Sequence, residues 1–174
     1  MESKRATDLM IPLSEYPHMP YWFTLRQAMA TLQSSRIEVE GKPSLPRAFL
    51  VFNEAYELLG VVRRRDILRG LEPQFLNKNG PKYSRKLFDV KTDPDLLELA
   101  NGKMAGQIKE RAERPVGDVM QPIKITLDHD DHLMKIIYEM VENNLSMIPV
   151  LQDGSVVGVV RSVDVLDEVS KLVL

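Results

Sequence analysis

Two aspartates stand at the same place in a segment that this chain contains twice. Residues 60–68 and 158–166 share Gly, Val, Val, Arg, Asp and Leu at identical spacing, which places Asp66 in one copy and Asp164 in the other. An ionised carboxylate only accepts hydrogen bonds, so it suits a ligand with neighbouring hydroxyl groups that donate them. The repetition predicts equivalent ligand sites in two halves of the protein.

An arginine precedes each acid by three residues, Arg63 in the first copy and Arg161 in the second. Each stands where a predicted strand leads into a helix, and the free N–H groups of a helix N-terminus favour an anion. A guanidinium is itself a strong bidentate partner of phosphate. The alternative is that these long side chains fill the sites, or pair with the acids, and so close them. The adjacent Arg64 and Arg65 are either part of a phosphate clamp or a solvated basic run.

A second match lies upstream of the first. Residues 8–12 and 118–122 share Asp, Met and Pro at the same spacing. Two ordered matches in two halves indicate an internal duplication. We divide the chain into repeat 1 at 1–70, a partly helical connector at 71–114 and repeat 2 at 115–174.

Hydrophobic periodicity gives the second repeat the order strand, helix, strand, strand, helix. Apolar residues at helical spacing predict a helix over 133–141, capped by Asp131, and Ser162 is expected to cap the last helix. Asp153-Gly154 is a hairpin turn signal, because glycine tolerates positive φ. The predicted strands are residues 123–127, 147–151 and 156–160.

The first repeat follows the same order with additional residues. Most of these lie at about 33–47, where we expect a surface loop. The connector shows a turn cluster at 77–81, and Asp93-Pro94 predicts the start of a helix that runs through Glu98. The helix face consists of Leu25, Ala28, Met29 and Leu32, and the hairpin strands are residues 49–52 and 58–62.

This organisation resembles a pair of CBS domains, also called a Bateman module. The resemblance rests on Asp118-Val119-Met120, Ile148-Pro149-Val150, Asp153-Gly154 and the segment from Gly158 to Asp164. It is weaker in the first repeat, where Leu50 stands at a position that the family often gives to proline. The resemblance implies an α/β fold in which two strand-helix-strand-strand-helix repeats pack about a pseudo-twofold axis, with clefts between them.

Modules of this family commonly bind adenosine compounds and regulate enzymes, channels or transporters. The resemblance therefore implies a stand-alone regulatory, energy-sensing module for AMP, ADP or ATP, with S-adenosylmethionine less favoured and no catalytic cofactor. It implies that Asp66 and Asp164 bind ribose hydroxyls. The family has Ser or Thr where this chain has arginine, so we expect the arginines to take over phosphate binding. The ligand-binding residues expected in total are Asp66, Asp164, Arg63, Arg161, Ser162, Ile148, Pro149 and Ile125.

A different class of function stays open, namely a dimerisation or interaction scaffold whose clefts are empty or degenerate. In either case we expect a homodimer, because modules of this family commonly pair through their helices, and an unidentified regulated protein partner. The sequence contains no Gly-x-Ser-x-Gly, no Gly-x-x-x-x-Gly-Lys loop and no cysteine, so we expect no enzyme.

Composition narrows the remaining classes. The 174 residues are 44% hydrophobic with a formal net charge of −2, which is ordinary for a globular protein and gives no general attraction to nucleic acid or to a membrane surface. No stretch approaches the roughly 20 apolar residues of a membrane span, and we expect a cytoplasmic protein. The segment 128–132 looks like a metal cluster, but aspartate is common at such loops and we expect no metal. Trp22 either packs on the core or stacks on a purine.

Overall fold

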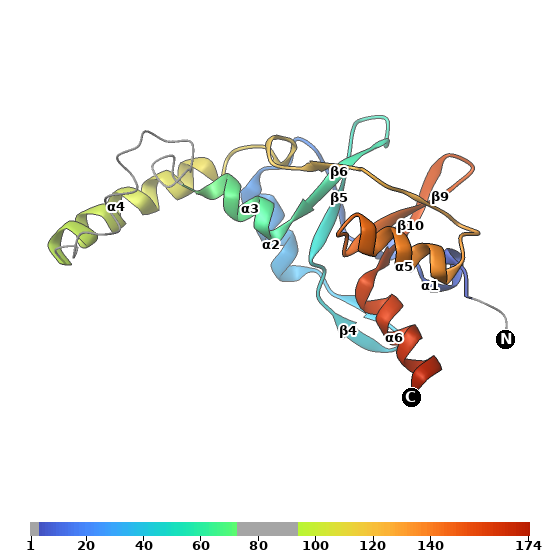
Figure 1. Cartoon of the computed structure of the whole chain (residues 1–174). Helices are drawn as coiled ribbons and strands as arrows, with labels where there is room; N and C mark the ends of the chain where they lie inside the picture. The colour runs from blue at the N-terminus through green and yellow to red at the C-terminus, as the bar shows by residue number, and fades with distance from the viewer. Residues whose placement is uncertain (1–3, 73–93) are drawn as a thin grey trace.

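The computed structural model describes residues 4–72 and 94–174, whose strands form two four-stranded sheets and one two-stranded sheet (Figure 1). Each repeat contributes most of one four-stranded sheet and the helices beside it. The α/β class and the tandem arrangement expected from the sequence are confirmed.

The first repeat contains the two helices and the hairpin that its periodicity predicts. The turn cluster at 77–81 lies outside the described residues. The elements are α1 (Ala6–Leu9), β1 (Ile11–Pro12), a 3-10 turn (Leu13–Glu15), β2 (His18–Pro20), α2 (Leu25–Ser34), β3 (Ile37–Val39), β4 (Lys42–Ser44), β5 (Ala48–Phe52), β6 (Leu58–Arg63) and α3 (Arg64–Leu71).

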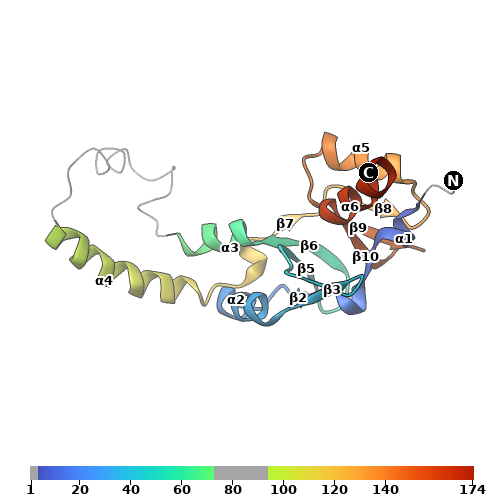
Figure 2. The same cartoon turned by 90° about the horizontal axis from the view of Figure 1, so that it is seen from below.

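The connector and the second repeat follow. The helix expected through Glu98 extends to Arg111 and projects away from the sheets (Figure 2). The hairpin turn is confirmed, with Asp153 and Gly154 at φ of 51° and 79°. The elements are α4 (Pro94–Arg111), a 3-10 turn (Val116–Asp118), β7 (Gln121–Pro122), β8 (Leu127–Asp128), α5 (Leu133–Glu142), β9 (Met147–Gln152), β10 (Ser155–Arg161) and α6 (Ser162–Val173).

The two repeats exchange their edge strands. The sheet of the first repeat has the order β2-β5-β6-β7, so β7 comes from the second repeat; the other sheet has the order β1-β10-β9-β8, so β1 comes from the first. The registers match: Gly60 lies opposite Pro122, and Gly158 lies opposite Pro12. This reciprocity gives the pair its pseudo-twofold symmetry.

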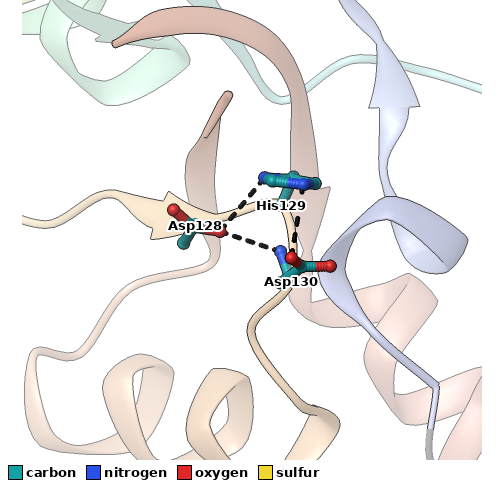
Figure 3. A group of neighbouring side chains, drawn as sticks. All are labelled: Asp128, His129 and Asp130. Carbon is teal, nitrogen blue, oxygen red and sulfur yellow. Dashed lines mark hydrogen bonds and ion pairs between the residues drawn. The ribbon is translucent and has the colours of Figure 1, made fainter. Parts of the chain in front are cut away.

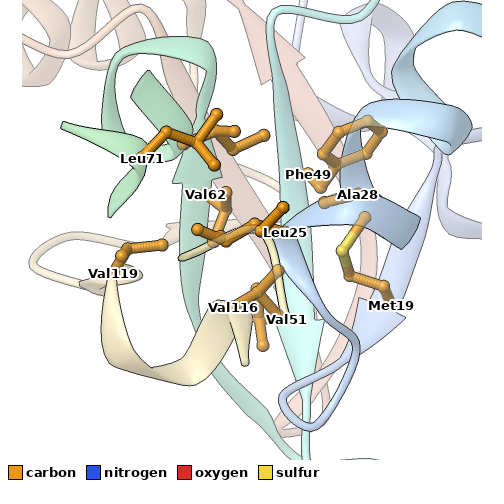
Figure 4. Close-up of a cluster of buried hydrophobic side chains, with 11 residues drawn as sticks. Met19, Leu25, Ala28, Phe49, Val51, Val62, Leu71, Val116 and Val119 are labelled. Carbon is orange, nitrogen blue, oxygen red and sulfur yellow. The ribbon is translucent and has the colours of Figure 1, made fainter. Parts of the chain in front are cut away.

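Each hydrophobic core likewise contains side chains from both repeats. The core beneath the first sheet includes Leu25 and Phe49, but also Val116 and Val119 from the start of the second repeat (Figure 4). The core beneath the second sheet includes Ala6 of α1. A third cluster joins residues of both repeats. Neither repeat is therefore a complete folding unit without the other, because each lends apolar side chains to its partner's core.

The segment at 33–47 is not the surface loop that we expected. It forms the β3–β4 hairpin, and Ile37 on it is only 1% exposed, packed in the third cluster. Two cross-repeat contacts hold this hairpin, from Arg161 to Ser44 and from Lys171 to Glu40. The side chain of Ile37 supplies the apolar anchor that a loop would lack.

Three finer predictions for the second repeat are also wrong. The strand at 123–127 is confined to Leu127–Asp128, because the chain crosses here from one sheet to the other and cannot stay in one ladder. Asp131 does not cap α5: His132 occupies the N-cap position, without a capping hydrogen bond from its side chain. The Asp131 carboxylate instead accepts from the Asp128 N–H and from Lys135. The N-cap of α6 is Arg161, so Ser162 is the first helical residue.

The exchanged strands make a prediction for Gly158. A Cβ at this position would lie 2.5 Å from the carbonyl oxygen of Ile11, a backbone atom that cannot move aside. Gly158→Ala should therefore destabilise the protein by about 1–3 kcal/mol, as overpacking does. Gly106→Ala on α4 is the control, since nothing lies within 4 Å of a Cβ there and alanine should stabilise that helix by about 0.5–1 kcal/mol. Urea denaturation measures both, and a Gly158→Ala variant as stable as wild type would contradict the tight strand pairing.

Candidate functional site

The repeated Gly-to-Asp segments form the two junctions where a strand enters a helix. In the first repeat β6 ends at Arg63, which is the N-cap of α3, and in the second β10 ends at Arg161, the N-cap of α6. Asp66 and Asp164 lie in the first turns of these helices. An acid is stabilised at this position by the helix dipole, whatever else it binds.

Asp66 is fully buried and its oxygens already have several donors. Arg63 donates through Nε to Oδ2 (2.9 Å) and through Nη2 to Oδ1 (3.0 Å), and its backbone N–H also donates to Oδ2 (2.9 Å). Arg69 and Gln121 donate to Oδ1 at 3.0 and 3.2 Å. Because Gln121 belongs to β7, this carboxylate also links the two repeats.

The electrostatics of Asp66 follow from these contacts. Burial would raise the pKa of its carboxyl group, but the hydrogen bonds from Arg63 and the charges of Arg63 and Arg69 outweigh it. The pKa of Asp66 therefore lies below its ordinary value. The group stays ionised because both arginines compensate its charge.

Asp164 has a simpler environment with the same partner. Arg161 donates through Nε to Oδ2 (2.7 Å) and through Nη2 to Oδ1 (2.8 Å), a bidentate pair. Its Nη1 donates to the Ser44 hydroxyl at 2.9 Å, and Arg161 is only 8% exposed. Arg63 and Arg161 thus both pair with their aspartates. This is the arrangement expected under the alternative in which the arginines close the ligand sites.

A first pocket, which we call the Pro149 pocket, has a volume of about 240 Å³. Its apolar wall includes Val61, Ile125 and Pro149. The charged side chains that line it are Arg63 and Lys124, and no carboxylate is among its lining residues. The pocket combines an apolar surface with positive charge.

A second pocket, which we call the hairpin pocket, has a volume of about 390 Å³. Its charged lining consists of Arg47, Arg64 and Arg161, again without a carboxylate. It shares Ala48, Ser146 and Met147 with the Pro149 pocket, so the two are neighbours.

A third pocket, of about 250 Å³, is acidic. Asp164 lines it together with six other carboxylates, whereas its lysines are Lys4 and Lys171. Hydrogen bonds to Asp167 and Glu40 raise the pKa of Lys171. This acidic pocket disfavours an anionic ligand.

The predicted ligand residues are divided among these places. Arg63, Ile125 and Pro149 line the Pro149 pocket. Arg161 and Ser162 line the hairpin pocket, and Asp164 lines the acidic pocket. The remaining two, Asp66 and Ile148, are fully buried, and Ile148 packs in the second core.

Sequence reasoning missed two cations and left a third open. Lys124 lines the Pro149 pocket and Arg47 lines the hairpin pocket, and neither was among the predicted residues. The sequence left open whether Arg64 and Arg65 clamp phosphate or are solvated. Arg64 lines the hairpin pocket, whereas Arg65 lines neither basic pocket. Arg47 lies three residues after the end of β4 at Ser44, and a loop prediction for 33–47 gives its side chain no defined position. Trp22 is half exposed and stands edge-on to Tyr21.

The segment at 128–132 does bring Asp128, His129 and Asp130 together (Figure 3). The Asp128 carboxylate faces Nδ1 of His129 at 3.1 Å, whereas the Asp130 carboxylate faces Nε2 at 3.4 Å. One ligand atom from each of these residues lies within 4.8 Å of the others, which is within reach of a single metal ion. Acids on both ring nitrogens also hold the imidazole in place without an ion, so the absence of a metal stays a prediction.

Comparisons with known proteins agree with this architecture. The family model described as CBS domain matches residues 116–171. An uncharacterized protein of Methanocaldococcus jannaschii is 32% identical over 100 residues, which cover 56% of this chain and 46% of the relative. The chain spans about half the length of that curated relative.

Solved structures with the same fold cover nearly the whole chain. CBSX2 in complex with AMP has a TM-score of 0.62 at 16% identity, covering 98% of both chains. A CBS domain-containing protein of unknown function from Bacillus anthracis has a TM-score of 0.65 at 19% identity, covering 97% of this chain and 94% of that one. The cytosolic domain of the Mg²⁺ channel MgtE in complex with ATP has a TM-score of 0.60 at 19% identity, covering 97% and 49%. Residues 116–171 match the CBS domain family, and the chain as a whole has the fold of a tandem CBS pair.

None of the helices in the described part of the chain combines the length and apolar character that crossing a bilayer requires.

The buried carboxylate predicts a pH-dependent stability. Asp66→Asn removes the charge that Arg63 and Arg69 compensate. These arginines are about half exposed (47% and 52%) and can be rehydrated, so the loss should be about 1–3 kcal/mol at pH 7. The pKa of Asp66 is lower in the folded protein than in the unfolded chain, where it is about 4. The ionised carboxylate therefore stabilises the fold fully above about pH 4, and this stabilisation is lost as the pH falls through the folded pKa.

Urea denaturation at pH 7 and pH 3 measures this dependence. The stability difference between wild type and Asp66→Asn should narrow at the lower pH. The control is Glu142→Gln, which replaces an exposed acid at the end of α5. This substitution should leave the free energy of unfolding unchanged at both pH values. A difference independent of pH would show that the Asp66 charge does not contribute.

Proposed function

We propose that this protein is a regulatory module that binds an adenosine nucleotide in the Pro149 pocket. The observation that carries the proposal is the pairing of an apolar wall with cations and no lining carboxylate. A purine base needs a dry, flat surface, and its phosphates need positive charge. Ile125 and Pro149 supply the first. Lys124 supplies the second, next to Arg63, whose charge is paired with Asp66.

The charge of the acidic pocket is opposite to that of the Pro149 and hairpin pockets. The acidic pocket would repel a phosphate, since its lining carries many more carboxylates than lysines. We therefore propose one nucleotide-binding side rather than two equivalent ones. In this assignment Asp66 positions Arg63, and Asp164 positions Arg161, so a ribose contact from either acid requires its arginine to move.

Structural relatives support a nucleotide as the ligand. CBSX2 is seen in complex with AMP and the MgtE cytosolic domain in complex with ATP. The chain has no cysteine, which suits a reducing compartment, and we propose a cytoplasmic location. The regulated protein partner is a further part of the proposal without an assigned identity.

The engaged acids favour one competing function. If both arginine–aspartate pairs hold permanently, the clefts are closed to ribose and the pair acts as a dimerisation or interaction scaffold. Ligand binding separates the two functions, because a ligand that binds only the native state raises its melting temperature.

The nucleotide proposal predicts a selective effect at Lys124, an exposed cation of the Pro149 pocket. ATP should stabilise the wild type in a thermal-shift assay. In calorimetry Lys124→Gln should weaken ATP binding by roughly tenfold, since a hydrogen bond to a charged group is worth about 1.5–3 kcal/mol. Lys103→Gln on α4 is the charge-matched control. Absence of stabilisation by AMP, ADP or ATP at millimolar concentration would favour the scaffold.

We also propose a homodimer formed by the outer faces of α5 and α6, which lie against each other (Figure 1). Met134, Tyr138 and Val141 are 60–71% exposed on α5, and Val163 and Leu166 are 55% and 66% exposed on α6. A contiguous apolar surface of this kind is typical of a protein–protein contact.

The dimer predicts a change in mass on introducing charge. Wild type should elute with about twice the 19.9 kDa chain mass in light scattering after size exclusion. The double variant Met134→Glu, Val141→Glu should become monomeric, because two acids would be buried without partners in the contact. Lys103→Gln should remain dimeric. A wild type that is monomeric at every concentration would exclude this contact.

A further inference from the structure

We propose that an exposed surface of the first repeat docks a basic, arginine-containing segment of a partner protein. This aromatic–acid surface consists of the rings of Tyr21, Trp22 and Tyr56 and the carboxylates of Glu54 and Glu57. None of these residues is among those that line the Pro149, hairpin or acidic pockets. The inference therefore does not depend on nucleotide binding, and it gives a regulated partner a place to bind and a chemical character.

Two large rings of this surface are open to solvent. Trp22 is 50% exposed and Tyr56 is 58% exposed. Trp22 stands edge-on to Tyr21, with ring centroids 5.3 Å apart, and Tyr56 stacks on the buried ring of Phe52 with centroids 4.7 Å apart. Each exposed ring is thus supported by a neighbouring ring and still has area left for a partner. Exposed tyrosine and tryptophan rings are enriched at protein–protein contacts.

Two exposed carboxylates accompany these rings on the turn between β5 and β6. The Tyr21 hydroxyl donates to Oε1 of Glu54 at 2.7 Å, and this hydrogen bond lowers the pKa of Glu54. The Asn53 side-chain amide donates to Oε2 of Glu57 at 2.6 Å. Both carboxylates are therefore held in place by neutral groups, and each retains lone pairs that a cationic donor can use.

The segments that form the surface carry acids but no basic partner for them. Residues 15–25 and 48–62 contain no lysine and no arginine. Arg26 in the first turn of α2 is paired with Glu113, and Arg114 is paired with Asp118. Over the ranges 4–72 and 94–174, the negative charge of the surface is therefore left for a partner to compensate.

Backbone hydrogen bonds fix the position of the rings. The N–H of Tyr21 donates to the carbonyl of Phe52 at 3.0 Å, and the carbonyl of Tyr21 accepts from the N–H of Gly117 at 2.9 Å. The turn holds Tyr56 at a φ of 59°, a left-handed conformation that is uncommon for a bulky residue. A surface that is already ordered has less conformational entropy to lose when a partner binds.

The equivalent part of the second repeat lacks these rings. There β9 and β10 are joined by the two residues Asp153 and Gly154, whereas residues 53–57 join β5 and β6. The segment before α5, residues 128–132, contains no tyrosine and no tryptophan. Since a two-residue turn is enough to pair the strands of this fold, the longer aromatic turn is not required by the sheet. Its side chains are therefore available for a role of their own.

An arginine-containing segment is the partner chemistry that this surface fits. A guanidinium is planar, stacks on an aromatic face and donates to carboxylates at the same time. Nucleic acids and anionic membranes would be repelled by Glu54 and Glu57. A purine also stacks on aromatic rings, but the phosphates of a nucleotide would meet the same two carboxylates.

Trp22 is the single tryptophan of the chain, so its fluorescence reports on this surface directly. The probe is a short peptide of alternating arginine and proline, and the control peptide has glutamate in place of arginine. The arginine peptide should change the emission of Trp22, and more weakly as salt is added, because salt screens exposed charges. The glutamate peptide should leave the emission unchanged. No response to the arginine peptide, or a response to adenosine in its place, would overturn the inference.

Variants locate the contact through the fluorescence polarisation of a dye-labelled arginine peptide. Trp22→Ala and Glu54→Gln should each weaken peptide binding by about fivefold. Glu40→Gln is the matched control, an exposed acid that lines the acidic pocket, and it should bind the peptide as wild type does. An equal loss in this control would place the peptide at the acidic pocket, and unchanged affinity in Trp22→Ala and Glu54→Gln would likewise contradict the inference.

ATP separates this inference from the proposed function. Stabilisation by ATP in a thermal-shift assay should be the same in wild type and Trp22→Ala, since Trp22 is not a lining residue of the Pro149 pocket. If ATP stabilises the protein and the arginine peptide does not bind, the nucleotide function stands and the docking surface fails. If the peptide binds and no nucleotide stabilises, the reverse holds. Circular dichroism confirms that each variant is folded.

Discussion

The reciprocal exchange of edge strands is the constraint on which the rest of this structure depends. Each four-stranded sheet is completed by a two-residue strand from the other repeat, and each core by apolar side chains from it. Gly60 and Gly158 permit the exchange, because a Cβ at either would meet the backbone of the crossing segment at 2.5 Å. The pair therefore folds as one unit, and its pockets are made from both repeats.

Symmetry in the backbone does not extend to the charges. The backbone signature is duplicated, yet one side of the pair presents two arginine- and lysine-lined pockets and the other presents a cavity rich in carboxylates. After duplication the β-ladders constrain only the residues that face the core. Side chains at the pocket rims are free to differ, and here they have diverged to opposite sign.

Much of the fold could be predicted from the sequence, because it depends on local patterns. The face of α5 follows from apolar spacing, and the turn at Asp153-Gly154 follows from glycine's conformational freedom. The site could be predicted only in part. Which residues share a pocket is set by the strand exchange, and no local pattern shows that Asp164 faces a different cavity from Pro149. The β3–β4 hairpin was equally hidden, since its stability comes from the distant partners of Ile37.

The arginine–aspartate pairs couple the pockets to the packing of the repeats. Asp66 holds Arg63 at one pocket and Gln121 of the exchanged strand at the same time, and Arg161 holds both Asp164 and Ser44 of the hairpin. An anion that draws Arg161 toward itself must weaken the bidentate pair with Asp164 or the bond to Ser44. Because charge-assisted hydrogen bonds are the strong ones, such a shift would be transmitted to the hairpin and to α6. The contacts of Arg161 thus tie the hairpin pocket to the β3–β4 hairpin and to the first turn of α6.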